Sequence, residues 1–226
     1  MIYLILSAII YFIPGLWVNY TLNKHNDVLS NMPFSAKEFG EELLKEKGLE
    51  DVKIETTKDG DHYDLIDKAV RVEPSRIDRK SLTSITVMCH EIGHAIQHKE
   101  KYPPLERRYK IAKVTNFLTK LASGIGYIGI PAILATGALP LIRVCLIVVF
   151  ASILISMIIH LMTLDVELDA SFKRAMPILE KKIPQEYHSA CKSILRVCAF
   201  TYVIASLTSI FKVRNLWMFV RIFLFR

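Results

Sequence analysis

Three stretches of the chain contain no charged side chain, and most polar residues lie between or after them. Residues 1–23, 121–142 and 144–164 lack Asp, Glu, Lys and Arg, and only Arg143 separates the second stretch from the third. A helix rises about 1.5 Å per residue, so residues 121–142 as one helix would be about 33 Å long, enough for the hydrocarbon core of a bilayer. The pattern predicts an N-terminal membrane anchor and, later in the chain, a transmembrane helical hairpin.

The charged region between these stretches predicts a helix followed by a small sheet. Ser35 with Glu38 three residues later forms a capping box, and Gly48 suits the position just after a helix, so we expect a helix between them. Beyond it, apolar and polar residues alternate in three short runs separated by turn residues, which is typical of a small antiparallel sheet. These runs are residues 52–56, 62–66 and 69–73.

A longer helix is predicted over residues 82–99, with Ser81 as its cap and Pro103 and Pro104 after its end. Apolar residues recur in it at helical spacing and predict a buried stripe. They are Leu82, Ile85, Met88, Ile92 and Ile96. The same helix contains the sequence His-Glu-x-x-His at residues 90–94.

This motif indicates a zinc site, because residues four apart lie on one face of a helix. His90 and His94 can therefore bind one Zn²⁺ ion. Glu91 is offset by about 100° and can reach a water in the open coordination position, where it would act as a general base. Gly93 between the histidines allows another segment to approach closely.

A third zinc ligand has to come from another part of the chain. His98 continues the series but lies about 12 Å along the helix axis from His90. That is too far for both to bind one ion with zinc–nitrogen bonds of about 2.1 Å. We therefore expect His98 to lie at the surface or to contact a zinc ligand without binding zinc itself. Glu167, flanked by Asp165 and Asp169, follows the third uncharged stretch, and a hairpin would return it to the side of the motif. Ala170 and Ser171 are small enough to allow close packing. The residues alone leave open which of the three acidic residues is the ligand.

Three segments resemble a family of neutral zinc metallopeptidases of bacterial membranes. They read CHEIGHAIQH (89–98), VELDAS (166–171) and DHYDL (61–65), in the same order as in the family. The resemblance implies that His90, His94 and Glu167 bind zinc and that Glu91 is the catalytic base. Two positions differ from the family pattern: Leu65 stands in place of Pro, and Cys89 in place of Ala. The arrangement is also similar to that of gluzincin membrane peptidases.

His62, within the DHYDL segment, has two interpretations. It could stabilise the oxyanion of the reaction as a further catalytic residue, or it could hydrogen-bond within its turn.

The expected fold is an α+β zincin-like core, with a small antiparallel sheet and the motif helix, fused to transmembrane helices and mainly α overall. The expected segments are an anchor at 1–23, the zincin-like region at 24–117, the hairpin at 118–164, an acidic helix at 165–192 and a membrane-associated helix or helices at 193–226.

The distribution of basic residues predicts the orientation and the partners. Lys and Arg cluster before residue 121 and after residue 164, which places the catalytic side in the cytoplasm of an integral protein of the bacterial cell membrane. The net charge of +7 favours contact with a lipid bilayer. Nucleic acid is not expected as a partner, because Asp and Glu nearly balance Lys and Arg in residues 24–117.

The predicted function is that of a membrane-anchored zinc endopeptidase acting on protein or peptide substrates. One alternative is an intramembrane metalloprotease, which would need the motif inside a spanning helix, although residues 81–98 are rather polar for that. The other is a catalytically inactive membrane scaffold.

Overall fold

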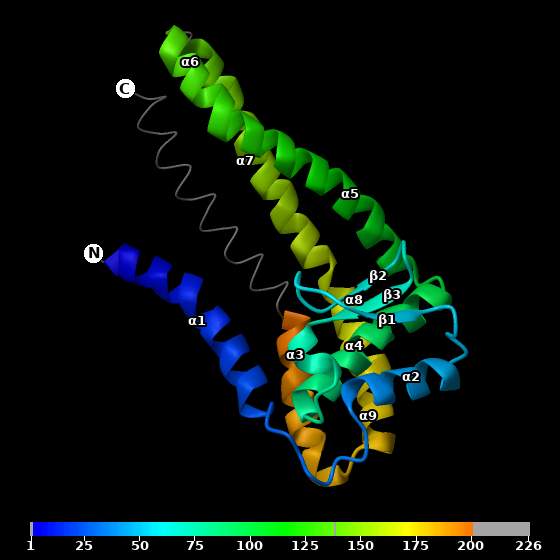
Figure 1. Cartoon of the computed structure of the whole chain (residues 1–226). Coiled ribbons are helices and arrows are strands. Elements are labelled where there is room, and N and C mark those ends of the chain that lie inside the picture. Colours follow the sequence, from blue (N-terminus) through cyan, green and yellow to red (C-terminus); the bar gives the residue numbers. More distant parts are fainter. Residues whose placement is uncertain (1, 138, 201–226) are drawn as a thin grey trace. The chain divides into compact units, whose positions relative to one another are not determined.

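The computed structural model describes residues 2–137 and 139–200 (Figure 1). These residues divide into two compact units, one made of residues 13–106 and 164–200 and the other of residues 2–12 and 107–163. Every site residue predicted from the sequence lies in the first, which we call the core unit.

The core unit contains most of the secondary structure. Its elements are α2 (Ala36–Glu46), β1 (Lys53–Thr56), β2 (His62–Asp64), β3 (Ala69–Val72), α3 (Pro74–Ile77), α4 (Leu82–Lys99), α8 (Leu164–Leu168), the π-helix η2 (Asp169–Ala175), α9 (Met176–Lys182) and the 3₁₀ turn η3 (Gln185–Tyr187). A further helix begins at residue 188 and continues through residue 200, so the rest of the predicted C-terminal segment 193–226 lies outside the described residues.

The remaining elements are helical. Two of them, α1 (Ile2–Lys24) and α5 (Pro103–Gly124), continue from one unit into the other, and the π-helix η1 (Ile125–Gly129), α6 (Ile130–Thr136) and α7 (Leu139–Met162) belong to the second unit.

Local sequence signals account for α2. The Ser35 hydroxyl accepts a hydrogen bond from the Glu38 backbone N–H, and Glu38 Oε2 accepts one from the Ser35 N–H at 2.7 Å, so the predicted capping box is confirmed. Gly48 has φ +61°, the left-handed conformation that glycine adopts readily after a helix. The buried side chains of Phe39 and Leu43 make α2 part of the core packed against α4.

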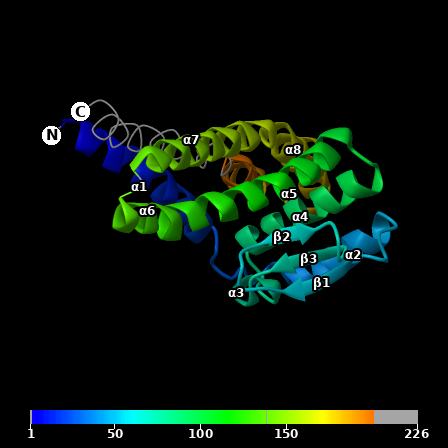
Figure 2. The same ribbon diagram turned by 90° about the horizontal axis from the view of Figure 1, so that it is seen from above.

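The sheet is mixed, and the prediction of an antiparallel sheet is wrong for one of its two pairings. The strand order is β1-β3-β2, with β1 parallel to β3 and β2 antiparallel to β3, as Figure 2 shows. After β1 the chain passes to the far side of β3 before it forms the β2–β3 hairpin, so β1 and β3 run in the same direction. Alternation of polar and apolar residues has the same period in both kinds of pairing, and it therefore does not distinguish them.

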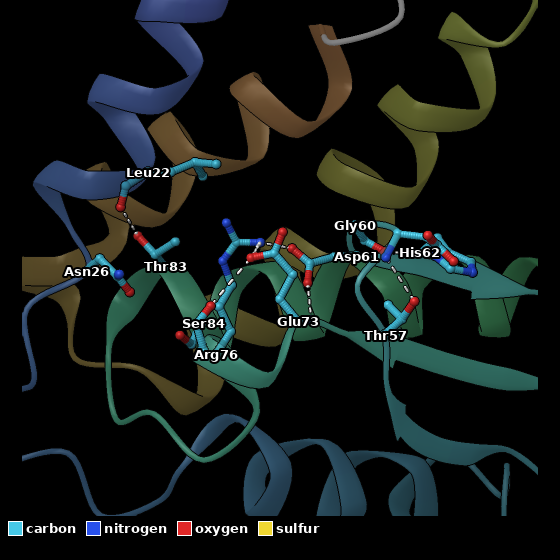
Figure 3. Close-up of polar contacts among 12 residues, drawn as sticks. Leu22, Asn26, Thr57, Gly60, Asp61, His62, Glu73, Arg76, Thr83 and Ser84 are labelled. Carbon is cyan, nitrogen blue, oxygen red and sulfur yellow. Dashed lines mark hydrogen bonds and ion pairs between the residues drawn. The ribbon is translucent and has the colours of Figure 1, made fainter.

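The motif helix α4 is the centre of the core unit. It begins after Ser81, whose hydroxyl accepts from the Ser84 N–H, as predicted. Every residue from Leu82 to Ala95 is buried, which is far more than the predicted stripe. The covering elements include α2, β2, β3, η2 and α9, and on another side the hydroxyl of Thr83 donates to the Leu22 carbonyl of α1 at 2.7 Å (Figure 3).

The prediction of transmembrane helices, and of an integral membrane protein, is not supported. Among the helices of residues 2–137 and 139–200, none is long and apolar enough to cross a membrane. The uncharged stretch 121–142 shows one reason, because it is divided among the end of α5, the π-helix η1, the seven-residue α6 and the start of α7. Gly137, at φ +72°, lies at the break between α6 and α7. Counting uncharged positions did not reveal these breaks.

Candidate metal centre

Three buried side chains from α4 and α8 converge on one point. The Nε2 atoms of His90 and His94 each lie 3.3 Å from Oε2 of Glu167. One ligand atom from each residue lies within 4.8 Å of the other two. The residues are 4%, 6% and 1% exposed, respectively, so the cluster is almost closed to solvent.

This arrangement fits a tetrahedral zinc ion. Zinc binds imidazole nitrogen and carboxylate oxygen at about 2.0–2.2 Å, and two ligand atoms at that distance in tetrahedral geometry are about 3.4 Å apart. The two separations of 3.3 Å agree with this value. Two histidines and one carboxylate leave a fourth position for a water or substrate, as in catalytic zinc sites.

The other ring nitrogens of the two histidines are also engaged. Nδ1 of His90 lies 3.1 Å from the Ser171 hydroxyl, and Nδ1 of His94 lies 2.9 Å from Oε1 of Gln97. Both Nε2 atoms therefore remain for the metal. Such outer contacts fix ring orientation at metal sites in general.

A close backbone contact brings the Glu167 segment to the motif helix. A Cβ atom added at Gly93 would lie 2.8 Å from the Ala170 carbonyl oxygen, closer than real Cβ contacts allow. The close approach expected at Gly93 and the close packing expected of Ala170 are both confirmed. Because Glu167 lies only three residues before Ala170, this close approach brings the segment that carries Glu167 next to the motif helix.

The π-helix η2 shapes the same segment. It directly follows α8, and four of its residues are buried, namely Asp169, Ala170, Ser171 and Ala175. π-Helical turns are rare and are often found at functional sites. Here the turn directs both Ser171 and Asp169 toward α4, where they contact His90 and Gln97.

The other acidic candidates lie elsewhere. Asp165 is exposed, and the carboxylate of Asp169 accepts hydrogen bonds from Gln97 and Arg174. In the part of the chain that the structure describes, neither joins the cluster of possible metal ligands. Of the three acidic residues, the structure brings only Glu167 to the two histidines.

Glu91 directly follows His90 in α4. Burial, and then the negative charges of Glu91 and Glu167, raise the pKa of the Cys198 thiol. Glu91 itself is 6% exposed, so it is positioned as a buried carboxylate beside the histidines of α4.

The two remaining histidines considered from the sequence have contacts away from the cluster. His98 Nδ1 lies 2.9 Å from the Tyr63 hydroxyl, consistent with its expected place outside the ligand set. His62 Nδ1 lies 2.8 Å from the Gly60 carbonyl, and His62 is paired with Arg71 in the sheet. Since side chains alternate along a strand, His62 points to the face opposite Tyr63, which packs on α4.

The DHYDL segment is held by contacts around the sheet. Asp61 forms an ion pair with Arg76 of α3 and accepts a hydrogen bond from the Glu73 N–H, as Figure 3 shows. Asp64 accepts from the backbone N–H groups of Ile66 and Asp67 at 2.8 and 3.1 Å. These contacts fix the β2–β3 hairpin beside α4.

Comparison with known proteins agrees with the chemistry of this site. No solved structure matches the chain. The chain is 32% identical over 215 residues to "Putative membrane protease YugP" of Bacillus subtilis (strain 168). The alignment covers 92% of this chain and 91% of the relative. A model of the family described as "Putative neutral zinc metallopeptidase" matches residues 1–223. The chain therefore belongs to this family of zinc metallopeptidases, whose cofactor is zinc and whose substrates are proteins or peptides.

Proposed function

We propose that the protein is a zinc-dependent endopeptidase of the gluzincin type, in which His90, His94 and Glu167 bind the metal and Glu91 is the general base. The observation that carries the proposal is the convergence of three ligand atoms within 4.8 Å of one another, with both histidine nitrogens at 3.3 Å from the Glu167 oxygen, a separation that suits tetrahedral zinc. The family supports the coarser statement that the protein is a protease.

The proposed chemistry needs one proton acceptor and a site that excludes bulk water. Bound zinc supplies Lewis-acid polarisation of the peptide carbonyl and lowers the pKa of an attacking water. The Glu91 carboxylate accepts the proton of that water and then delivers it to the amine that leaves. Its burial favours this role, because bulk water cannot compete for the proton at a side chain that is 6% exposed.

His62 remains a further catalytic candidate under this proposal. Its Nδ1 hydrogen-bonds with the Gly60 carbonyl, an acceptor, so Nδ1 carries the proton in that contact. Nε2 can then donate to an oxyanion only in the imidazolium form. His62→Gln, which retains a side-chain donor, and His62→Ala would separate the two interpretations: oxyanion stabilisation predicts lower kcat in His62→Ala with partial recovery in His62→Gln.

The proposed function is tested by hydrolysis of casein with wild type and Glu91→Gln, each with its zinc content measured. We expect zinc in both proteins and cleavage by the wild type alone, because the substitution removes the base and keeps every ligand. Glu50→Gln, the same change at an exposed position, is the matched control and should cleave like the wild type.

Two results would contradict the proposal. Equal cleavage by Glu91→Gln would show that Glu91 is not the base. If the wild type contains no zinc after dialysis against a buffer with zinc, the alternative of a catalytically inactive scaffold would be favoured. The alternative of an intramembrane protease has no support from the described residues, since none of their helices could span a membrane.

A further inference from the structure

We propose that Gln97 is a positioning residue that holds His94 in the tautomer able to bind zinc, and that Asp169 and Arg174 hold Gln97 in turn. This inference rests on the proposed metal site and adds to it the group that orients one of its ligands. Its central contacts, among His94, Gln97 and Asp169, join residues that are buried in the core unit.

The contacts of Gln97 allow a single orientation of its amide. Its side chain is fully buried, and Nε2 donates to the Val166 carbonyl at 2.9 Å and to Asp169 Oδ2 at 2.8 Å. A carbonyl oxygen and a carboxylate oxygen can only accept, so both N–H groups of the amide are used there. Turning the amide over would place Oε1 against two other acceptors.

This orientation determines the tautomer of His94. Oε1 of Gln97 is an acceptor, so the Nδ1 atom of His94 that lies 2.9 Å from it must carry the proton. In neutral imidazole the other nitrogen then has a free lone pair. That nitrogen is Nε2, the atom that lies 3.3 Å from Glu167 Oε2 at the proposed zinc position.

The carboxylate of Asp169 is itself held in place. Arg174 Nε donates to the same Oδ2 atom at 2.6 Å, and Arg174 Nη1 donates to Glu100 Oε2 at 2.7 Å. The guanidinium also lies 5.6 Å from the centre of the Tyr102 ring. Because the guanidinium is always charged, it favours an Asp169 that accepts from Gln97 rather than one that donates to it.

The π-helix makes this arrangement possible. Asp169 and Arg174 are five residues apart within η2, and π-helical backbone brings residues at that spacing one above the other. In an α-helix, residues five apart point about 140° away from each other. The unusual backbone of η2 therefore has a defined consequence: it lets one segment place Asp169 against Gln97 and Arg174 against Asp169.

His90 has a partner of a different kind. The Ser171 hydroxyl donates to the Leu195 carbonyl at 3.4 Å and lies 3.1 Å from His90 Nδ1. A hydroxyl has a single proton, so while it donates to Leu195 its oxygen accepts from His90 Nδ1 and leaves Nε2 for the metal. A hydroxyl can rotate out of this arrangement, whereas the Gln97 amide, with both of its donors used, has a single orientation.

The test is the zinc dissociation constant, measured by competition with a chromogenic chelator on the full chain. Gln97→Met keeps the size of the side chain and removes the acceptor, and we expect zinc binding about 10- to 100-fold weaker. Gln97→Glu alone should also weaken it, because the new carboxylate faces Asp169 and the Val166 carbonyl. Gln97→Glu combined with Asp169→Asn exchanges the amide and the carboxylate, so the new amide at position 169 can donate where two carboxylates would otherwise meet. The contact with the Val166 carbonyl stays unfavourable, and we expect the double variant to bind zinc more tightly than Gln97→Glu alone.

Controls separate positioning from packing. His98 lies one turn beyond His94 on α4, and His98→Ala should bind zinc like the wild type. Thermal unfolding of the zinc-free proteins reports packing, and the visible spectrum of the Co²⁺-substituted proteins reports ligand geometry, which should change in Gln97→Met and be closer to that of the wild type in the double variant than in Gln97→Glu.

The outcomes distinguish this inference from the proposed function. Zinc binding by the wild type, weakened in Gln97→Met and tighter in the double variant than in Gln97→Glu, would support the positioning role. Unchanged affinity in Gln97→Met, or a double variant no better than Gln97→Glu, would overturn it and leave the metal site intact. If Gln97→Met does not fold, the comparison of the single and double glutamate variants decides. No zinc binding by the wild type would overturn both proposals.

Discussion

The contact between Gly93 and Ala170 gives the sharpest prediction, which concerns Gly93→Ala. The new Cβ would lie 2.8 Å from the Ala170 carbonyl oxygen, and ordinary contact begins at 3.4 Å, so the two backbones must separate by about 0.6 Å. Metal–ligand distances tolerate deviations of only about 0.2 Å. A separation of this size would carry Glu167 away from the two histidines.

Two opposing effects set the stability of Gly93→Ala. Alanine favours a helix over glycine by about 1 kcal/mol, whereas forcing extra volume into a packed core costs about 1–3 kcal/mol. The atom in the way is backbone, which cannot move aside as a flexible side chain could. We therefore expect Gly93→Ala to be neutral to about 2 kcal/mol less stable, and to bind zinc at least 10-fold more weakly.

The assay combines urea unfolding of the zinc-free protein with chelator competition for zinc. Gly15→Ala is the matched control, because Gly15 also lies in a helix but has no atom within 4 Å of the added Cβ. It should leave zinc binding unchanged and be as stable as the wild type or more so. A Gly93→Ala variant that gains stability and binds zinc like the wild type would refute the argument that this contact positions Glu167.

Three further predictions concern the metal ligand, a helix cap and a buried tyrosine. Glu167→Ala should abolish zinc binding measured by metal analysis, while Asp165→Ala, at an exposed position, should retain it; the opposite result would show the ligand to be misassigned. Ser35→Ala removes a capping box and should cost about 0.5–2 kcal/mol in urea unfolding, and no loss would mean that α2 does not depend on its cap. Burial, with the charges of Asp51 and Asp64, raises the pKa of Tyr63 to about 12. The unfolded chain then loses this proton first, so stability should fall as the pH rises from about 10 to 12, by up to about 3 kcal/mol. Tyr63→Phe should remove that part of the pH dependence, and identical profiles would refute the assignment.

Local signals in the sequence predicted the local structure well. The capping box of Ser35 and Glu38, the left-handed Gly48 and the cap at Ser81 all involve contacts between residues a few positions apart, so the sequence contains all the information. The motif on α4 is of the same kind, because the spacing of His90 and His94 alone places both on one helix face.

Long-range features were harder to predict, each for a physical reason. The parallel pairing of β1 with β3 depends on the path of the chain between strands, which alternation does not report. The burial of α4 on nearly all sides depends on elements distant in sequence. The contacts of Gln97 with Asp169 depend on the π-helical register of η2, and no composition or spacing rule used on the sequence would indicate it.

The position of Glu167 beside the histidines involves close packing of its segment on α4. Besides the family resemblance, two features of the sequence favoured Glu167: a membrane hairpin would return the chain to the side of the motif, and small residues at 170 and 171 would allow close packing against the motif helix. The first depends on spans that the described helices do not provide. The second describes a contact that the structure contains, between the Gly93 backbone and the Ala170 carbonyl. The residue next to that carbonyl, Ser171, also contacts His90, so a backbone contact and a side-chain contact both join the Glu167 segment to the helix that bears the histidines.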